Sequence, residues 1–424
     1  MKAIGIDIGT TTISTVVLDQ ESRQVLRSET ISNGSFIRTE NSWERIQDPD
    51  VILPKARNVL DKFLTEFPDT ASIGITGQMH GIVYMDASGH ALSPLYTWQD
   101  GRGEAILDII RDKTGKTVAS GYGLVTHIYN LMHDLVPTGT AKLGTIGDYL
   151  GMQLCGLTEP LIHISNAASL GFFDSRRCCF DQDSLLKMGV DPSILPEITD
   201  EFTKLGEYRG IPVTAAIGDN QASFLGSVGL QENVLLLNMG TGGQISVLSN
   251  HFFEAPGIEA RPLVRGKYLL VGSSLCGGRA YAILENFLRA YVKAACGEDA
   301  SQYQVMAELA AKGAGADPMR VDTRFNGSRT DPALRGSITN LSEDNFTPEG
   351  LIYGILYGMS KELFDLYAQI REGTGIVARL LIASGNGYRR NPILRQISGE
   401  MFGAKLIPAP YEEEAACGAA ISSF

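Results

Sequence analysis

The chain has 424 residues, of which 44% are hydrophobic and 20% are charged, a composition typical of a globular protein long enough for two domains. Its net charge of −12 argues against nucleic acid or an anionic membrane as a partner, because both bind basic surfaces. With no membrane-spanning apolar run, no signal-type segment and no metal-type spacing among its six cysteines, the sequence predicts a cytoplasmic protein with reduced thiols.

The chain begins with a predicted β-hairpin whose turn is rich in glycine and threonine. In AIGIDIGTTTISTVVLD, residues 3–19, two apolar strands flank the turn, and Asp7 is the acidic residue of the first strand. A buried carboxylate is costly unless it binds a cation or is fully hydrogen-bonded. Asp7 is therefore a candidate metal ligand beside a phosphate-binding turn, and the alternative is that its side chain caps the turn.

Strand and helix patterns alternate along the rest of the chain, which favours two α/β domains with a boundary near Gly229. The segments 309–318 and 324–332 are rich in glycine and polar residues and are predicted to be mobile surface segments. The predicted strands are 72–77, 82–85, 213–217, 267–272 and 379–384, and the predicted helices are 51–66, 102–113, 279–295, 350–371 and 392–402.

Two neighbouring segments of the first domain have the residue types of a polyol pocket. Glycines bracket Gln78, Met79 and His80 in GITGQMHGIVYMD, residues 74–86, so this turn can present polar groups into a cavity. In LYTWQDGR, residues 95–102, Trp98 offers an apolar face to sugar C–H groups. Gln99, Asp100 and Arg102 supply donors and acceptors for hydroxyls. The alternative is that Trp98 belongs to the core and His80 is a hydrogen-bonded turn histidine.

The opening hairpin is repeated in the second half of the chain. In NVLLLNMGTGGQISVLS, residues 233–249, Asn238 falls where Asp7 falls, and Gly240–Thr241 matches Gly9–Thr10. Two such turns facing each other across a cleft would bind one polyphosphate through backbone amides and hydroxyls. Asp7 would then bind Mg²⁺, and the neutral Asn238 would avoid repelling the phosphates.

Three further segments complete the sequence pattern. In TAAIGDNQASF, residues 214–224, Asp219 lies between a strand end and a helix start, where it is either a catalytic carboxylate or a helix N-cap. ASGNGYRRNP, residues 383–392, predicts a strand and a glycine turn suited to a nucleotide. EEEAACGAAISSF, residues 412–424, predicts an acidic helix start followed by small residues that pack tightly against a neighbour.

Taken in this order, the segments GIDIGTT, GQMHG, TWQDGR, GDNQAS, LNMGTGG and SGNGYRRNP resemble the FGGY family of carbohydrate kinases, within the actin, Hsp70 and sugar kinase superfamily. The resemblance implies two ribonuclease-H-like domains, 1–228 and 229–424, closing on ATP, Mg²⁺ and a sugar in an interdomain cleft. It implies that the γ-phosphoryl group passes to a sugar hydroxyl. The implied roles are catalytic base for Asp219, metal for Asp7, sugar contact for Gln78, Met79, His80, Trp98 and Asp100, phosphate contact for Thr10, Thr11, Gly240 and Thr241, and adenosine contact for Gly385 and Asn386.

Within the family, GQMHG is similar to the ketose branch, and TWQDGR, with its Gln99, is most similar to sedoheptulokinases and next to xylulokinases. Ser14 stands where many relatives carry lysine, and Asn166 where many carry aspartate. The sequence therefore predicts a ketose kinase with a small-molecule sugar as partner, and a homodimer is considered as well. The alternatives are a filament-forming or chaperone-like ATPase of the same superfamily and an inactive kinase that senses sugar.

Overall fold

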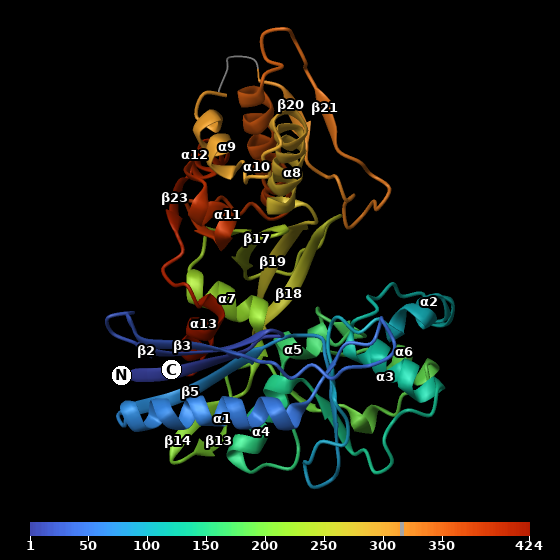
Figure 1. The fold of residues 1–424 in the computed structure, drawn as a ribbon. Helices are drawn as coiled ribbons and strands as arrows, with labels where there is room; N and C mark the ends of the chain where they lie inside the picture. Colours follow the sequence, from blue (N-terminus) through green and yellow to red (C-terminus); the bar gives the residue numbers. More distant parts are fainter. Residues whose placement is uncertain (314–317) are drawn as a thin grey trace. The chain divides into compact units, whose positions relative to one another are not determined.

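The computed structural model describes residues 1–313 and 318–424 and divides the chain into two compact units. Unit 1 consists of Met1–Gly229, Arg261–Lys267 and Pro410–Phe424, and unit 2 of Leu230–Ala260 and Tyr268–Ala409. Each unit contains a mixed sheet with helices (Figure 1), so the predicted α/β class with two domains is confirmed. The domain division between residues 228 and 229 stays a prediction.

Unit 1 is built on a seven-stranded sheet of order β13-β14-β5-β1-β2-β3, with β15 also paired to β5. The predicted opening hairpin is confirmed, since β1 pairs antiparallel with β2, and β5 runs parallel to β1 on its other side. The strands are β1 Lys2–Ile8, β2 Thr12–Asp19, β3 Val25–Ser32, β5 Thr70–Gly77, β13 Lys204–Tyr208, β14 Ile211–Thr214 and β15 Ile217–Gly218.

Side chains of β1 alternate between the two faces of this sheet. Ile4, Ile6 and Ile8 pack in one core with helices α1 (Pro49–Glu66) and α4 (Ile146–Cys155). The opposite face is covered by α7 (Asp219–Ser227) and α13 (Glu414–Ser422), as Figure 1 shows. Unit 1 therefore has three layers, the sheet and one layer of helices on each of its faces.

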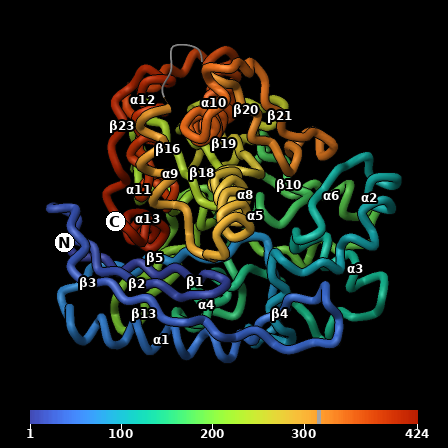
Figure 2. Tube along the Cα trace, turned by 45° about the horizontal axis from the view of Figure 1, so that its top comes forward, coloured from blue at the N-terminus to red at the C-terminus, as the bar shows by residue number. Residues whose placement is uncertain are grey.

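Helix α13 approaches the sheet so closely that only glycine fits beneath it. A Cβ on Gly5 would lie 1.9 Å from the Ala416 carbonyl oxygen, and one on Gly74 would lie 1.8 Å from that of Ala419. Against α7 the fit is equally close, because a Cβ on Gly418 would lie 1.7 Å from the Ala222 oxygen. Figures 1 and 2 both show the red C-terminal helix beside the blue N-terminal strands. The predicted tight packing of the last segment is confirmed.

A second core of unit 1 lies among short strands and helices, around Ile82, Tyr84, Leu124 and Ile162. Residues 78–102, which include the predicted sugar-contact residues, belong to this part of unit 1. They are β4 Ile46–Gln47, β6 Val83–Met85, β7 Leu95–Tyr96, η1 Arg102–Ile106, α2 Leu107–Thr114, α3 Gly123–Met132, β8 Lys142–Gly144, β9 Leu161–His163, α5 Ile164–Ser169, β10 Phe173–Asp174, β11 Cys179–Phe180, α6 Gln182–Lys187, η2 Pro192–Ile194 and β12 Glu197–Thr199.

A six-stranded sheet of order β18-β19-β17-β16-β22-β23 lies mainly in unit 2, and its main core includes Leu235, Leu237, Leu356 and Leu381. Residues Arg261–Lys267, at the adjoining ends of β18 and β19, are counted with unit 1. The predicted second hairpin is confirmed by the antiparallel pairing of β16 with β17. The elements are β16 Val234–Met239, β17 Gly243–Ser249, β18 Ile258–Val264, β19 Lys267–Ser274, α8 Gly277–Cys296, α9 Tyr303–Ala310, β20 Arg320–Asp322, β21 Ser337–Thr339, α10 Pro348–Thr374, β22 Leu380–Ser384, α11 Gly385–Arg390, α12 Pro392–Phe402 and β23 Lys405–Pro408.

Two local predictions need correction. The strand predicted over 213–217 is interrupted, because β14 ends at Thr214 and β15 begins at Ile217. The turn predicted after β22 is a short helix, α11, which begins at Gly385. Residues 314–317 of the predicted mobile segment 309–318 lie outside the described residues. No helix in the described part of the chain combines the length and apolar character needed to cross a membrane.

Candidate functional site

Asp7 lies near the end of β1, directly before the glycine-threonine turn. Its register partner on β2 is Ser14, and its partner on β5 is Thr76. Oδ1 of Asp7 is buried and, within the described residues, has no hydrogen-bond partner. An unpartnered carboxylate oxygen leaves a vacant acceptor for a cation or a donor group.

Asp219 comes to the same end of the sheet from another strand. Gly218 of β15 and Ile8 of β1 are both register partners of Gly77 on β5, so the strand ends that carry Asp7 and Asp219 flank β5. Asp219 is the first residue of α7. The loops after parallel strands meet at one edge of a sheet, which explains how residues more than two hundred positions apart become neighbours.

The environment raises the pKa of both carboxyl groups. Burial raises the pKa of Asp7 to about 7, and the negative charges of Asp219 and Glu413 add to this effect. Burial also raises the pKa of Asp219 to about 6, although the backbone N–H of Asn220 and the charge of Arg261 oppose the increase. A carboxylate with a pKa near 6 can act as a general base near neutral pH.

Glu413 is the third acidic residue in this region and was predicted from the sequence only as part of an acidic helix start. Its Oε1 accepts a hydrogen bond from the Thr30 hydroxyl at 2.9 Å. The Thr30 hydroxyl lies 2.9 Å from that of Ser14. The Ser14–Thr30–Glu413 chain therefore holds a carboxylate on the side of the hairpin where Asp7 lies.

A ring of hydrogen bonds joins predicted sugar residues to a predicted phosphate residue. Trp98 Nε1 donates to Thr10 Oγ1 at 3.0 Å, and Thr10 Oγ1 donates to Gln78 Oε1 at 3.3 Å. Gln78 Nε2 donates to Gln47 Oε1 at 2.8 Å, and Gln47 Nε2 donates to the Thr10 carbonyl at 2.7 Å. Trp98 is 47% exposed, which leaves much of the indole accessible. Thr11, the residue after Thr10 in the turn, is exposed.

Gln47 completes this ring, yet its sequence context carries no signal that would single it out. It lies in a two-residue strand, β4, and is fully buried. With no glycine turn or periodic pattern around it, a single glutamine gives no indication of a functional role. Only the fold, which pairs β4 with β7, places Gln47 beside the residues before Trp98.

Met79 and His80 occupy fixed positions after β5. Met79 is buried, and a Cβ on Gly218 would lie 2.6 Å from its Cε, so Met79 packs against the residue before Asp219. His80 has a φ of 73°, and its ring stacks on Tyr122 with centroids 5.0 Å apart. Its Nδ1 lies 2.7 Å from the Ser169 carbonyl oxygen, which can only accept, so Nδ1 carries the proton. The local fold thus defines the orientation of the imidazole.

Asp100 is engaged by a neighbouring arginine. Its carboxylate accepts from Arg102 Nε at 2.6 Å and from the Arg45 backbone N–H at 3.0 Å, and its side chain is not exposed. Arg102 also lies over the ring of Tyr96, 4.3 Å from its centroid. In this arrangement Asp100 fixes the loop that carries Trp98. Contact between Asp100 and a sugar stays a prediction.

In unit 2, the second hairpin turn is held by the start of α8. The N–H of Gly278 donates to the Gly240 carbonyl at 2.9 Å, and that of Arg279 donates to the Thr241 carbonyl at 3.0 Å. Gly240 and Thr241 are exposed. Asn238 Nδ2 donates to Ser384 Oγ at 3.2 Å, which joins this hairpin to the end of β22. The turn therefore has a fixed backbone with an accessible surface.

The segment predicted to bind the nucleotide begins at Gly385, directly after Ser384. Gly385 has a φ of 83°, and a Cβ there would lie 2.7 Å from the Met239 carbonyl oxygen, so both conformation and space require glycine. Asn386 is exposed at the start of α11. Contacts of Gly385 and Asn386 with adenosine stay predictions.

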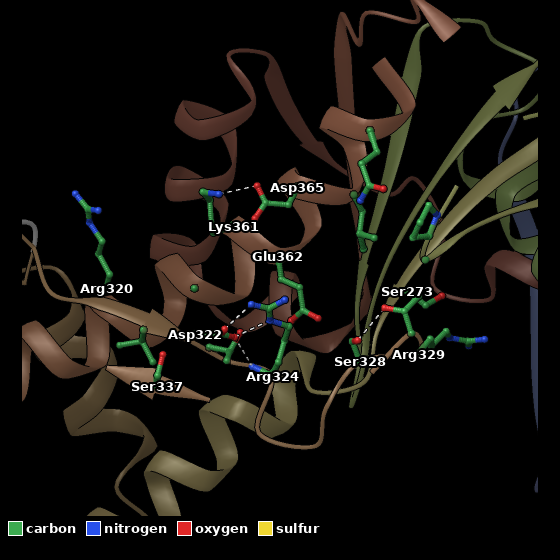
Figure 3. Close-up of a pocket in the computed structure, with 18 of the residues that line it drawn as sticks. Ser273, Arg320, Asp322, Arg324, Ser328, Arg329, Ser337, Lys361, Glu362 and Asp365 are labelled. Carbon is green, nitrogen blue, oxygen red and sulfur yellow. Dashed lines mark hydrogen bonds and ion pairs between the residues drawn. The ribbon is translucent and has the colours of Figure 1, made fainter. Parts of the chain in front are cut away.

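A cavity of about 330 Å³ lies elsewhere within unit 2 (Figure 3). Its charged side chains are largely paired with one another. Arg324 Nε donates to Asp322 at 2.8 Å, and Lys361 Nζ donates to Asp365 at 2.6 Å. Figure 3 shows Arg320 pointing away from these pairs. Among the described residues, this cavity includes none of those predicted to bind sugar, phosphate or nucleotide.

Comparisons with known proteins agree with this arrangement of motifs. Models for the N-terminal and C-terminal domains of the FGGY family of carbohydrate kinases match residues 2–226 and 235–424. The sedoheptulokinase of Mus musculus is 27% identical and is aligned over 93% of this chain and 91% of its own length. A glycerol kinase of Dechloromonas aromatica is 26% identical, covering 82% of this chain and 73% of its own. The xylulose kinase structure from Rhodospirillum rubrum superposes with a TM-score of 0.83 at 23% identity, over 100% of this chain and 89% of that one.

Proposed function

The chain belongs to the FGGY family of carbohydrate kinases, and on that premise we propose that it phosphorylates a ketose, sedoheptulose first and D-xylulose second. That it is an ATP-dependent sugar kinase follows from the family and from its full-length similarity to sedoheptulokinases. The sequence-based recognition of the family is thereby confirmed, and the proposal concerns the acceptor sugar and the residues that act on it.

One contact carries the proposal for the acceptor site. Trp98, with an exposed indole face, donates its N–H to the hydroxyl of Thr10 in the phosphate turn. A sugar stacked by its C–H groups on Trp98 would thus lie beside the turn that we propose to contact the phosphates. Gln78 and His80 would supply hydrogen-bonding groups for the sugar hydroxyls, and Met79 an apolar wall.

We assign the catalytic step to Asp219. Its carboxylate would accept the proton of the attacking hydroxyl and align the oxygen with the terminal phosphorus of ATP. The pKa of Asp219, raised to about 6 by burial, is suited to this task, because the group is ionised at neutral pH and basic enough to accept a proton. The oxygen–phosphorus bond to the leaving ADP breaks as the new bond to the sugar forms.

Asp7 fits a role as ligand of Mg²⁺. Its buried Oδ1 has no partner among the described residues, and carboxylate oxygens are preferred ligands of this ion. In the described part of the chain, no group of three or more histidine, cysteine or acidic side chains is placed to hold a metal. We therefore propose that the ion is shared with the phosphate oxygens of ATP, whose charge it would neutralise.

The remaining assignments are proposals for the turns and for the nucleotide. In unit 1, Thr10 and Thr11 would contact phosphates, and in unit 2 Gly240 and Thr241 would do the same. Gly385 and Asn386 would contact adenosine, since they follow the end of β22 and Asn386 is exposed at the start of α11. A cytoplasmic location and a homodimer remain predictions from the sequence.

A panel of acceptors tests the proposed substrate. We expect ADP release to depend on sugar and to be fastest, as kcat/KM, with sedoheptulose, followed by D-xylulose, with glycerol and gluconate much slower. The control is the same assay without any acceptor. Preference for glycerol or gluconate would contradict the ketose assignment, and ATP hydrolysis indifferent to every sugar would favour the alternative ATPase.

Replacing Glu413 with glutamine tests the electrostatic coupling to Asp7. Because the charge of Glu413 raises the pKa of Asp7, its removal should lower that pKa and leave Asp7 ionised at lower pH. The pKa of Asp7, followed by NMR titration of its carboxyl group in protein without Mg²⁺ or nucleotide, should then be lower than in the wild type. Glu412→Gln is the matched control, and an unchanged pKa of Asp7 in Glu413→Gln would disprove the coupling.

A further inference from the structure

The residue directly before Asp219 is held by a buried serine from another segment. The backbone N–H of Gly218 donates to Ser165 Oγ at 2.8 Å. Gly218 is the N-cap of α7, and its lack of a side chain means that it cannot cap the helix itself. Ser165, in α5, is completely buried. This hydrogen bond therefore fixes the backbone where β15 becomes the helix that begins with Asp219.

The hydroxyl of Ser165 has a defined direction because it donates a hydrogen bond to His163. Ser165 Oγ lies 2.7 Å from His163 Nδ1, and the backbone N–H of Ser165 donates to the same Nδ1 at 3.2 Å. Nδ1 is therefore the unprotonated nitrogen of a neutral imidazole, and burial lowers the pKa of His163 to about 3. The donors thus run in one direction, from Gly218 N–H to Ser165 Oγ–H to His163 Nδ1.

The histidine in turn is fixed by packing. His163 is completely buried, and its ring stacks on Phe202 with centroids 5.7 Å apart. Its Nε2 is buried and has no hydrogen-bond partner among the described residues. His163 is the N-cap of α5, and its Nδ1 accepts hydrogen bonds from both the backbone N–H and the hydroxyl of Ser165. These two contacts join the buried histidine to Ser165.

Gly218 is also confined by the predicted sugar-contact segment. A Cβ at this position would lie 2.6 Å from Met79 Cε and 2.7 Å from Gln221 Oε1. The backbone before Asp219 is thus packed against Met79 and hydrogen-bonded to Ser165. A movement at Gly218 would be transmitted to the carboxylate of Asp219, the next residue.

We propose that Ser165 is a positioning residue for Asp219, and that His163 orients the Ser165 hydroxyl so that it accepts from Gly218. The inference rests on the proposed role of Asp219 as the base. A general base must lie within hydrogen-bond distance of the proton that it accepts, and small misplacements of reacting groups reduce rates strongly.

Replacement of Ser165 by alanine should reduce kcat by about tenfold to a hundredfold. The KM for ketose and the affinity for ATP should change little, because the residues assigned to bind them keep their contacts. Ser165→Thr retains a hydroxyl and should recover most of the activity. Ser227→Ala, which removes another buried hydroxyl from the far end of α7, is the matched control and should keep wild-type kcat.

A second pair of variants tests the proposal even if Ser165→Ala does not fold. His163→Asn retains an acceptor near the position of Nδ1 and should stay active, whereas His163→Leu should lose kcat to the same extent as Ser165→Ala. Wild-type kcat in both Ser165→Ala and His163→Leu would overturn the positioning role while Asp219 remained the base. If Asp219→Asn itself kept normal turnover, the proposed role of Asp219 would fail instead.

Discussion

Asp219→Asn should reduce kcat by about three orders of magnitude while the affinity for ATP stays nearly unchanged. Asparagine has the same size as aspartate and can occupy the same place at the start of α7, but its amide cannot accept the proton of a sugar hydroxyl. The loss should therefore appear in kcat at saturating ketose and ATP. Binding of ATP, measured by calorimetry, separates the chemical step from nucleotide affinity.

The pH dependence gives a second test of Asp219. Because the base must be ionised, wild-type kcat should rise with pH through about 6, where burial places the pKa of Asp219. The residual activity of Asp219→Asn should lack this step. Asp183→Asn, in the first turn of α6, is the control for the same change at another helix start. Normal turnover in Asp219→Asn would remove this carboxylate from the mechanism.

Gly74→Ala should destabilise unit 1 by about 3 kcal/mol or more. The new Cβ would lie 1.8 Å from the carbonyl oxygen of Ala419, and no real contact is that short. Both groups belong to the backbone, so no change of rotamer can relieve the clash, and α13 must move away from β5. Urea unfolding followed by circular dichroism measures the loss as a lower midpoint.

Gly399→Ala is the control for this substitution. In α12 a Cβ at position 399 would lie 3.7 Å from its nearest neighbour, which is an ordinary contact, so this variant should be as stable as the wild type or slightly more stable. An unchanged midpoint in Gly74→Ala would mean that α13 does not rest on β5 as closely as described.

The two hairpins could be predicted because their signal is local. Ile4, Ile6 and Ile8 alternate with Gly5 and Asp7 before a glycine turn, and a second apolar run follows at once, so pattern and pairing coincide. The turn after β22 was predicted incorrectly because two glycines in three residues usually interrupt a helix. Here Gly385 alone makes the turn, and helix α11 begins with it.

The candidate site could be predicted only in part, because several of its contacts join distant positions. Thr10, Gln78 and Trp98 stand out by their motifs, but the ring that joins them needs Gln47, whose neighbours show no pattern. Likewise, the spacing of Asp100 and Arg102 shows that they are near in sequence but not that the carboxylate is enclosed. Burial of a polar side chain depends on tertiary packing, which periodicity does not encode.

Unit 1 is formed by segments from both ends of the sequence, and this affects the order in which it can fold during synthesis. The helix that covers β1 and β5 comes from residues 410–424, so the ribosome must synthesise all of unit 2 before this face of the first sheet can be closed. Domains usually fold in the order of translation, from the N-terminus onward. Here unit 2 emerges before the last segment of unit 1, so a nascent chain arrested before residue 410 would leave the Asp7 strand uncovered on one side.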